Sequence, residues 1–263
     1  MADDPIVFID SGVGGLPYLK MARIYMPGEN FVYVADNKNF PYGEKNANML
    51  KEIILELIQN IVDKISPKLV VIAWNTASVV ALSLLREKFG IPFVGVVPAI
   101  KPAGKISENG SIGLLATRKT VDDPYTDTLI EQFASTCRVE KYAGIDLVEF
   151  VENSYFTSTE NDKMVIVSKA WEYFINCKID ALVLGCTHFV YLKDHFNRSL
   201  GSSVDIIDSQ EGVSKQILRI IQRESLQSNN KTKDLFFITG SKFDQSNYLQ
   251  FADEYGLLLE GRL

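Results

Sequence analysis

Three side chains that can do chemistry follow one another directly after an apolar stretch. Residues 181–185 are small and apolar, and Cys186, Thr187 and His188 come next. The apolar run is typical of a buried strand of a parallel sheet, and open α/β sheets bind ligands at the carboxyl ends of their strands. A single Cys or His is more often a buried structural residue. The clustering of a thiol, a hydroxyl and an imidazole at one strand end therefore indicates a functional site.

A second strand end with a similar layout lies earlier in the chain. Leu69–Ala73 is another apolar strand, and Trp74, Asn75 and Thr76 follow it. In each of the two stretches, one residue separates the strand from the polar residues that follow. This residue is Trp74 after the earlier strand and Cys186 after the later one. The separation is about one domain's length of chain, so each half of the protein is expected to provide one such strand end.

The N-terminal strand ends in a motif suited to binding an anion. Ile6–Ile9 is followed by Asp10, Ser11 and glycines at positions 12, 14 and 15, after which a helix is expected. A strand, a glycine-rich turn and a helix N-terminus direct free backbone N–H groups outward. The glycine spacing matches neither a dinucleotide fingerprint nor a Walker A loop. Asp10 either caps the helix or faces a cationic amine, and local evidence leaves both interpretations open.

A polar loop follows the next predicted strand, Phe31–Ala35. It extends from Asp36 to Gly43 and contains Pro41 and Tyr42. Such a loop presents backbone N–H groups and a tyrosine hydroxyl to a ligand, or it is a plain surface turn.

The elements that position these residues alternate between strand and helix along the whole chain, which predicts an α/β fold with largely parallel sheets. Residues 101–109 are rich in Lys, Gly, Pro and Ser and are interpreted as a crossover segment. The sequence predicts one α/β domain made of residues 1–98 plus 208–263, and a second made of residues 99–207. A helix is expected over residues 241–255.

Composition narrows the classes of function. The net charge of −6 argues against nucleic acid as a partner, because phosphate binding needs a basic surface. No apolar run has the length needed to cross a bilayer, and the acidic N-terminus lacks the basic region of a signal peptide. Three cysteines and two histidines, without a Cys-x-x-Cys pair, predict reduced thiols, a cytoplasmic location and no zinc site.

Taken in order, the motifs resemble those of the glutamate racemases, within the cofactor-independent aspartate/glutamate racemase superfamily. They cover nearly the whole chain: Asp-Ser-Gly-x-Gly-Gly-Leu at 10–16, Pro-Tyr-Gly at 41–43, Asn-Thr-Ala-Ser at 75–78, Thr-x-x-Thr at 117–120, Val-Glu at 151–152 and Leu-Gly-Cys-Thr-His-Phe at 184–189. His188 after Cys-Thr, together with the Pro-Tyr-Gly loop, is similar to the glutamate branch, because aspartate racemases usually carry Glu at that position.

The resemblance implies two doubly wound, flavodoxin-like α/β domains with the active site in the cleft between them. It implies glutamate as substrate, D-glutamate supplied for peptidoglycan, no cofactor and no metal, and homodimers, which are common in the family. One thiolate removes the α-proton and a second thiol returns a proton to the opposite face. A thiol with a pKa near ~8.5 suits both roles once its surroundings tune it.

The same resemblance implies a role for particular residues. Cys186 is the base toward L-glutamate, and His188 and Glu152 tune its thiol. Asp10 is also implied in catalysis. The implied substrate-binding residues are Asp10, Ser11, Pro41, Tyr42, Gly43, Asn75, Thr76, Thr117, Thr120, Thr187 and His188.

Trp74 departs from the family pattern, because the family has its first catalytic cysteine there. An indole has no proton to exchange at useful pH, and its N–H is only a donor. Three explanations stay open. The chain is an inactivated variant, or Asp10 or a water molecule supplies the second proton, or the chemistry has changed. In the third case the chain resembles arylmalonate decarboxylases, which keep only the second cysteine.

Overall fold

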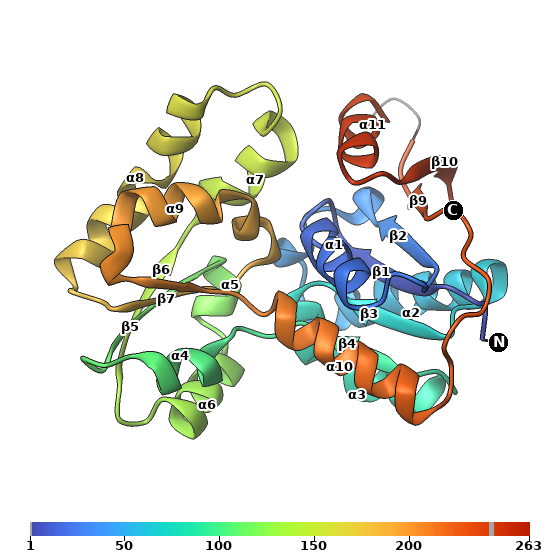
Figure 1. Cartoon of the computed structure of the whole chain (residues 1–263), viewed down its shortest axis with the longest axis horizontal. Helices are drawn as coiled ribbons and strands as arrows, with labels where there is room; N and C mark the ends of the chain where they lie inside the picture. The colour runs from blue at the N-terminus through green and yellow to red at the C-terminus, as the bar shows by residue number, and fades with distance from the viewer. Residues whose placement is uncertain (1, 242–244) are drawn as a thin grey trace. The chain divides into compact units, whose positions relative to one another are not determined.

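The computed structural model describes residues 2–241 and 245–263, except for the side chains of residues 44, 76, 77, 79, 80 and 245. The chain forms two compact units (Figure 1). Unit 1 consists of residues 1–96 and 210–263, and unit 2 consists of residues 97–209. The boundaries expected from the sequence, after residue 98 and before residue 208, each lie two residues away from these.

Among the described residues, unit 1 contains a six-stranded sheet in the order β10-β9-β2-β1-β3-β4, and every neighbouring pair is parallel. The chain passes from β1 to β2 on one side and then to β3 on the other side of β1, so the sheet is doubly wound. The strands are β1 (Ile6–Asp10), β2 (Phe31–Ala35), β3 (Leu69–Ile72), β4 (Phe93–Gly95), β9 (Leu235–Ile238) and β10 (Leu258–Arg262).

Helices cover both faces of this sheet because its strands are apolar on both sides. On one face, α2 (Ala47–Ile65) and α3 (Asn75–Lys88) pack against alternate strand residues such as Val7, Val32 and Val70. The side chains of Ile6 and Phe8 point to the other face, where α1 (Leu16–Tyr25) and α10 (Gln210–Arg223) contact each other. The last helix is α11 (Gln245–Glu254). The expected helix over residues 241–255 includes residues 242–244, which lie outside the described residues.

Among the described residues, unit 2 holds a four-stranded parallel sheet in the order β6-β5-β7-β8. Its strands are β5 (Ser111–Ala116), β6 (Arg138–Ala143), β7 (Ala181–Leu184) and β8 (Asp205–Ile207). Its helices are α4 (Ile100–Ile106), α5 (Arg118–Val121), α6 (Pro124–Phe133), α7 (Ile145–Ser154), α8 (Glu160–Asn176) and α9 (Lys193–Leu200), with a 3-10 helix, η3, at Thr187–Leu192.

This sheet is also packed on both faces. One face is covered by α4 and α6, whose Ile100 and Leu129 meet Ile112 and Val183 of the strands. On the other face α8 approaches β5 closely: a Cβ atom on Gly113 would lie 2.8 Å from the ring of Phe174. The prediction of two α/β domains with mainly parallel sheets is confirmed.

The interpretation of residues 101–109 as the crossover between the two halves is wrong, because unit 2 already begins at residue 97 and Ile100–Ile106 form its helix α4. Pro102 lies in the first turn, where the missing N–H is no loss. Gly104 permits close packing, since a Cβ there would lie 2.4 Å from the carbonyl oxygen of Phe133. The Pro and Gly residues that suggested a crossover thus lie in the first turn of this helix and at its contact with α6.

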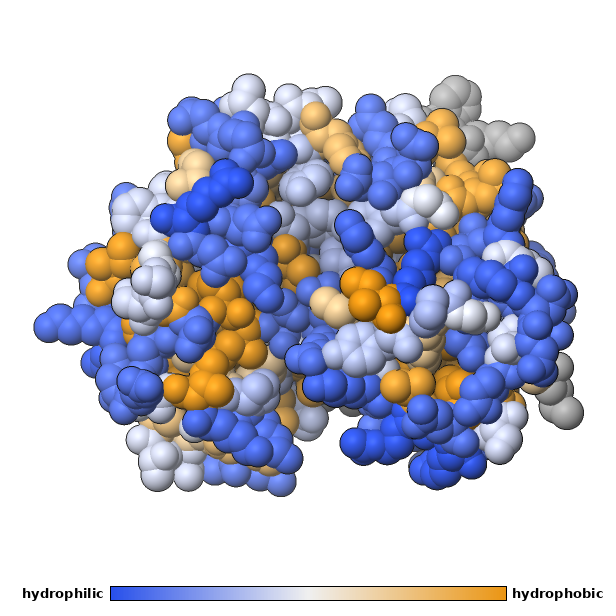
Figure 2. All heavy atoms as spheres, in the orientation of Figure 1, coloured by the Kyte–Doolittle hydropathy of each residue, from blue (hydrophilic) through white to orange (hydrophobic). Residues whose placement is uncertain are grey.

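The face of the molecule seen in Figure 2 is mostly hydrophilic, with apolar side chains interspersed. Within the described residues, no helix combines the length and the apolar character needed to cross a membrane.

Candidate functional site

The carboxyl ends of three neighbouring strands of unit 1 carry the Asp10 cluster, which we define as Asp10, Asp36, Tyr42, Trp74 and Asn75. Asp10 ends β1, Asp36 follows β2, and Trp74 follows β3 by two residues. The strand order β2-β1-β3 brings them together, and the N–H of Asp36 donates to the carbonyl oxygen of Asp10 at 2.8 Å. All five members are almost fully buried.

Asp10 organises the glycine-rich turn and does not cap α1. Its Oδ1 accepts hydrogen bonds from the N–H of Gly12 at 3.2 Å and from the hydroxyl of Ser11 at 3.4 Å. The N-cap of α1 is Gly15, so the capping interpretation of Asp10 is wrong. Its carboxylate instead belongs to a tight turn at the ligand edge of the sheet.

Tyr33 on β2, which the sequence analysis did not predict as a site residue, holds the glycine-rich turn in place by hydrogen bonds. Its hydroxyl donates to the carbonyl oxygen of Gly12 at 2.8 Å and accepts from the N–H of Gly15 at 3.0 Å. A Cβ atom on Gly15 would lie 2.6 Å from the Cβ of Ala73, so only glycine lets the turn lie this close to the end of β3.

Asp36 connects the Pro41–Gly43 loop to the sheet. Its carboxylate accepts hydrogen bonds from the hydroxyls of Tyr42 and Thr239, both at 2.5 Å, and from Nδ2 of Asn39 at 2.9 and 3.1 Å. Three donors satisfy a buried charge that would otherwise be costly. The loop position of Tyr42 is therefore set by a carboxylate that follows β2.

Tyr42 stays protonated and packs against Trp74. Burial raises the pKa of the Tyr42 hydroxyl well above its usual value, and the charge of Asp36, the hydrogen bond to it and the charge of Asp10 raise it further. The rings of Tyr42 and Trp74 have centroids 5.0 Å apart at 51°. Pro41 and Gly43, on either side, are partly exposed and leave the loop backbone accessible.

Trp74 belongs to the apolar core of unit 1. Only 5% of its surface is exposed, and it lies in the same cluster of buried residues as Tyr42 and Ile72. Ser78, one turn into α3, donates its hydroxyl hydrogen to the carbonyl oxygen of Trp74 at 2.8 Å, which holds this strand-to-helix corner. Asn75 is buried in the first turn of α3. The Thr76 side chain, predicted to bind substrate, lies outside the described residues.

Unit 2 carries the second group of predicted site residues, the Cys186 cluster, which we define as Cys186, Thr187, His188 and Glu152. Cys186 comes two residues after β7, and Thr187 and His188 begin η3. Glu152 comes from α7, which contacts η3. The four residues are 0–4% exposed.

A chain of contacts links the thiol to a carboxylate. Nε2 of His188 donates to Oε1 of Glu152 at 2.6 Å, and Nδ1 of His188 lies 3.8 Å from Sγ of Cys186. The hydroxyl oxygen of Thr187 lies 3.5 Å from the same Nδ1. One ring nitrogen of His188 therefore faces the carboxylate while the other faces the sulfur.

His188 carries a positive charge in this environment. Burial by itself lowers the pKa of His188, but the hydrogen bonds to Cys186 and Glu152 and the negative charge of Glu152 outweigh it, so the pKa lies well above its usual value. An imidazolium beside Sγ attracts negative charge that develops on the sulfur. Cys186 thus has the surroundings of an acid-base thiol.

The two threonines predicted to bind substrate lie at the same edge of unit 2. They follow β5, the neighbour of β7. Thr117 is the N-cap of α5, and its Oγ1 accepts from the N–H of Thr120 at 3.3 Å and donates to Oγ1 of Thr120 at 3.1 Å. Both hydroxyls therefore serve a helix cap, with Thr117 partly exposed and Thr120 buried.

Among the residues that the structure describes, no group of three or more His, Cys, Asp and Glu side chains is placed to hold a metal ion.

Comparison with known proteins shows the protein family of this chain. Residues 21–215 match the family model described as Asp/Glu/Hydantoin racemase. The chain belongs to this family.

Within it, the chain is similar to glutamate racemases. It is 39% identical over 230 residues to the glutamate racemase of Actinobacillus pleuropneumoniae serotype 7, covering 87% of this chain and 85% of that one. It is 36% identical over 258 residues to that of Treponema pallidum, covering 97% and 95%. Of solved structures, Escherichia coli glutamate racemase with L-glutamate and the activator UDP-MurNAc-ala matches with a TM-score of 0.88 and 32% identity, over 99% of this chain and 98% of that one.

Proposed function

We propose that this chain interconverts L- and D-glutamate without a cofactor, and that it supplies D-glutamate for peptidoglycan. The observation that carries the proposal is the buried sequence of contacts from Cys186 through His188 to Glu152. It is supported by the 36–39% identity to glutamate racemases and by the likeness to a glutamate racemase structure that contains L-glutamate.

Cys186 is the group that moves the proton. Its thiolate takes the α-hydrogen of L-glutamate: the Cα–H bond breaks, an S–H bond forms, and the electron pair stays on Cα, delocalised into the α-carboxylate. The imidazolium of His188 attracts the negative charge on sulfur before the transfer, and Glu152 keeps that imidazolium charged. In the reverse direction the thiol returns its proton to the same face.

The Asp10 cluster binds the substrate in this proposal. Asp10 and Ser11 bind the α-amino and α-carboxylate end, and Asn75, Thr76 and Thr187 add hydrogen bonds to the α-carboxylate. Backbone groups of the Pro41–Gly43 loop hold the side-chain carboxylate. What supports this assignment is that Asp10 and Asp36 lie at the carboxyl ends of adjacent strands, and that Asp36 holds the loop by accepting the hydroxyl hydrogen of Tyr42.

The proton on the opposite face has a different source in this chain. Trp74 offers no exchangeable acid at neutral pH, and its ring packs in the core against Tyr42. Asp10, one strand away from Trp74 and almost fully buried, either supplies this proton or holds the water molecule that does. We therefore expect removal of the α-proton by Cys186 to be faster than inversion.

We propose a homodimer in the cytoplasm with glutamate as its small-molecule substrate. The structure has Cys137, Cys177 and Cys186 as free thiols, which supports a reducing compartment.

Circular dichroism tests the proposal. Purified protein is incubated with D-glutamate or with L-glutamate, and the loss of optical activity is followed for the wild type and for Cys186→Ser. Cys137→Ser and Cys177→Ser are matched controls, because each removes a thiol elsewhere in unit 2. The proposal predicts racemisation that only Cys186→Ser abolishes. Equal activity of all four proteins, or no activity of the wild type with either enantiomer, would overturn it.

A further inference from the structure

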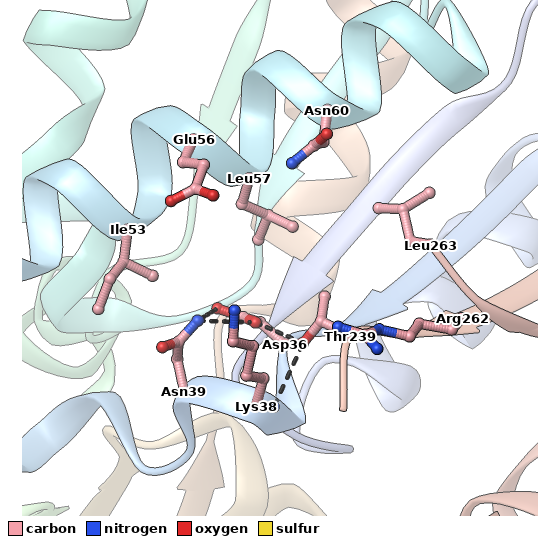
Figure 3. A pocket seen from close by; sticks show the side chains of 10 residues that line it. All are labelled: Asp36, Lys38, Asn39, Ile53, Glu56, Leu57, Asn60, Thr239, Arg262 and Leu263. Atoms are coloured by element: carbon pink, nitrogen blue, oxygen red, sulfur yellow. Dashed lines mark hydrogen bonds between the residues drawn. The ribbon is translucent and has the colours of Figure 1, made fainter. Parts of the chain in front are cut away.

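Unit 1 contains a cavity of about 240 Å³ at the side of Asp36 that faces α2. Figure 3 shows helix α2 on one side and the ends of the neighbouring strands on the other. Its lining combines charged, polar and apolar side chains: Asp36, Lys38, Asn39, Ile53, Glu56, Leu57, Asn60, Thr239, Arg262 and Leu263. This volume lies just below the roughly 300–1,000 Å³ of pockets for drug-sized ligands, so the cavity suits a smaller molecule.

Side chains of both charge signs line the cavity: the carboxylates of Asp36 and Glu56 and the cations Lys38 and Arg262. Asp36 is already satisfied by Tyr42, Asn39 and Thr239 and is buried. Lys38 comes from the loop after β2, Arg262 from the end of β10 and Glu56 from α2. Within the described part of the chain, none of these three forms an ion pair. The cavity thus offers two cations and one carboxylate to a ligand.

An apolar wall completes the lining. Ile53 and Leu57 lie one turn apart on α2, and Leu263 faces the cavity from beyond β10 (Figure 3). Contact with these side chains removes apolar surface of a ligand from water, at about 25 cal/mol per Å².

We propose that this cavity binds a free α-amino acid with an apolar side chain. The ligand carboxylate lies between Lys38 and Arg262, since charge-assisted hydrogen bonds to a carboxylate are the stronger kind. The ammonium group faces Glu56, and the apolar side chain contacts Ile53 and Leu57. A simple anion would leave Glu56 facing like charge, and a simple amine would leave both cations without a partner.

The cavity shares Asp36 with the substrate-binding loop, so its occupant is placed to influence that loop. Asp36 and Asn39 line the cavity, and the same Asp36 carboxylate accepts the hydroxyl hydrogen of Tyr42. This consequence rests on the proposed function: a bound amino acid changes the KM for glutamate through Tyr42. Binding itself does not depend on turnover.

Isothermal titration calorimetry with L-leucine as the probe tests the site on the full chain. Two further probes each lack one charged group: 4-methylpentanoate has no ammonium, and 3-methylbutylamine has no carboxylate. The proposal predicts that L-leucine binds and that each truncated probe binds at least tenfold more weakly. Tighter binding of 4-methylpentanoate or of the amine would overturn the zwitterion assignment.

Variants locate the binding. Lys38→Ala combined with Arg262→Ala is expected to weaken leucine binding at least tenfold. The matched control combines Lys88→Ala with Arg219→Ala, which removes the same charges from exposed positions outside the cavity. Glu56→Gln is expected to abolish the preference for leucine over 4-methylpentanoate. Unchanged binding by the Lys38 and Arg262 variant would refute the site, whereas an inactive enzyme that still binds leucine would count only against the proposed reaction.

Discussion

The charge of His188 depends on Glu152, and Glu152→Gln tests that dependence. Glutamine keeps the size of the side chain and an oxygen that accepts from Nε2, but it carries no charge. Burial lowers the pKa of His188, while contacts with Cys186 and Glu152 raise it well above its usual value. Without the charge of Glu152 the effect of burial is opposed only by Cys186 and a hydrogen bond to a neutral amide, so the pKa of His188 is expected to fall.

The magnitude follows from the geometry of the thiol and the ring. Sγ of Cys186 lies 3.8 Å from Nδ1 of His188, and opposite charges at about 4 Å attract by about 4 kcal/mol at an effective dielectric constant near 20. Complete loss of this attraction corresponds to about 10³ in rate. Because relaxation recovers part of it, we expect α-proton exchange at neutral pH to fall about 10²–10³-fold in Glu152→Gln.

The same change alters stability with a defined pH dependence. A histidine whose pKa is raised by folding stabilises the native state fully below its ordinary pKa of about 6.5, and this contribution disappears as the pH rises through the folded value. Removing one partner of a buried pair costs about 3–5 kcal/mol. The unfolding free energies of wild type and Glu152→Gln should therefore differ most below about pH 6.5 and approach each other at alkaline pH.

NMR titration of the imidazole Cε1–H signals measures the pKa directly. The chain has only two histidines, and His195→Gln assigns the pair. The reasoning predicts a His188 signal that stays in its charged form through neutral pH in the wild type and titrates at lower pH in Glu152→Gln. A wild-type His188 that titrates near pH 6.5, or identical curves for both proteins, would refute it.

Three further predictions concern other residues. Trp74→Cys should raise the rate of racemisation measured by circular dichroism at least tenfold, because it places a thiol at the end of β3; an unchanged rate would show that residue 74 does not limit inversion. Asp36→Asn should raise the KM for glutamate and lower the unfolding free energy by about 1–3 kcal/mol, since Tyr42 loses its charged acceptor; an unaltered KM would contradict this role. Lys68→Met should lower the unfolding free energy in urea by about 3–5 kcal/mol without affecting turnover, because Lys68 pairs with the buried Glu29 at the opposite, N-terminal edge of the sheet; a loss of turnover in the folded variant would contradict that separation.

Local sequence patterns predicted the fold well because each strand reads as an apolar run followed by a turn signal. The predicted strand Phe31–Ala35 has the same limits in the structure, and the placement of Cys186 directly beyond a strand holds within one residue. These features depend on neighbours in sequence, where periodicity carries the information.

Interactions between distant residues were not predictable in the same way. Asp36 binds Thr239, which is 203 residues away. The hydroxyl of Tyr33, on β2, donates to Gly12 in the turn that follows β1. The strand β10 was missed because Leu258–Arg262 lacks a strand-like pattern and contains Gly261 at φ 112°.

The most direct test of the central claim is exchange of the α-proton in heavy water. L-glutamate and D-glutamate are incubated separately with the wild type and with Cys186→Ser, and the α-proton signal is followed by NMR. The account predicts that the wild type removes the α-proton of L-glutamate, that D-glutamate forms more slowly, and that Cys186→Ser does neither. Retention of the α-proton in L-glutamate by the wild type, or exchange that continues in Cys186→Ser, would contradict it.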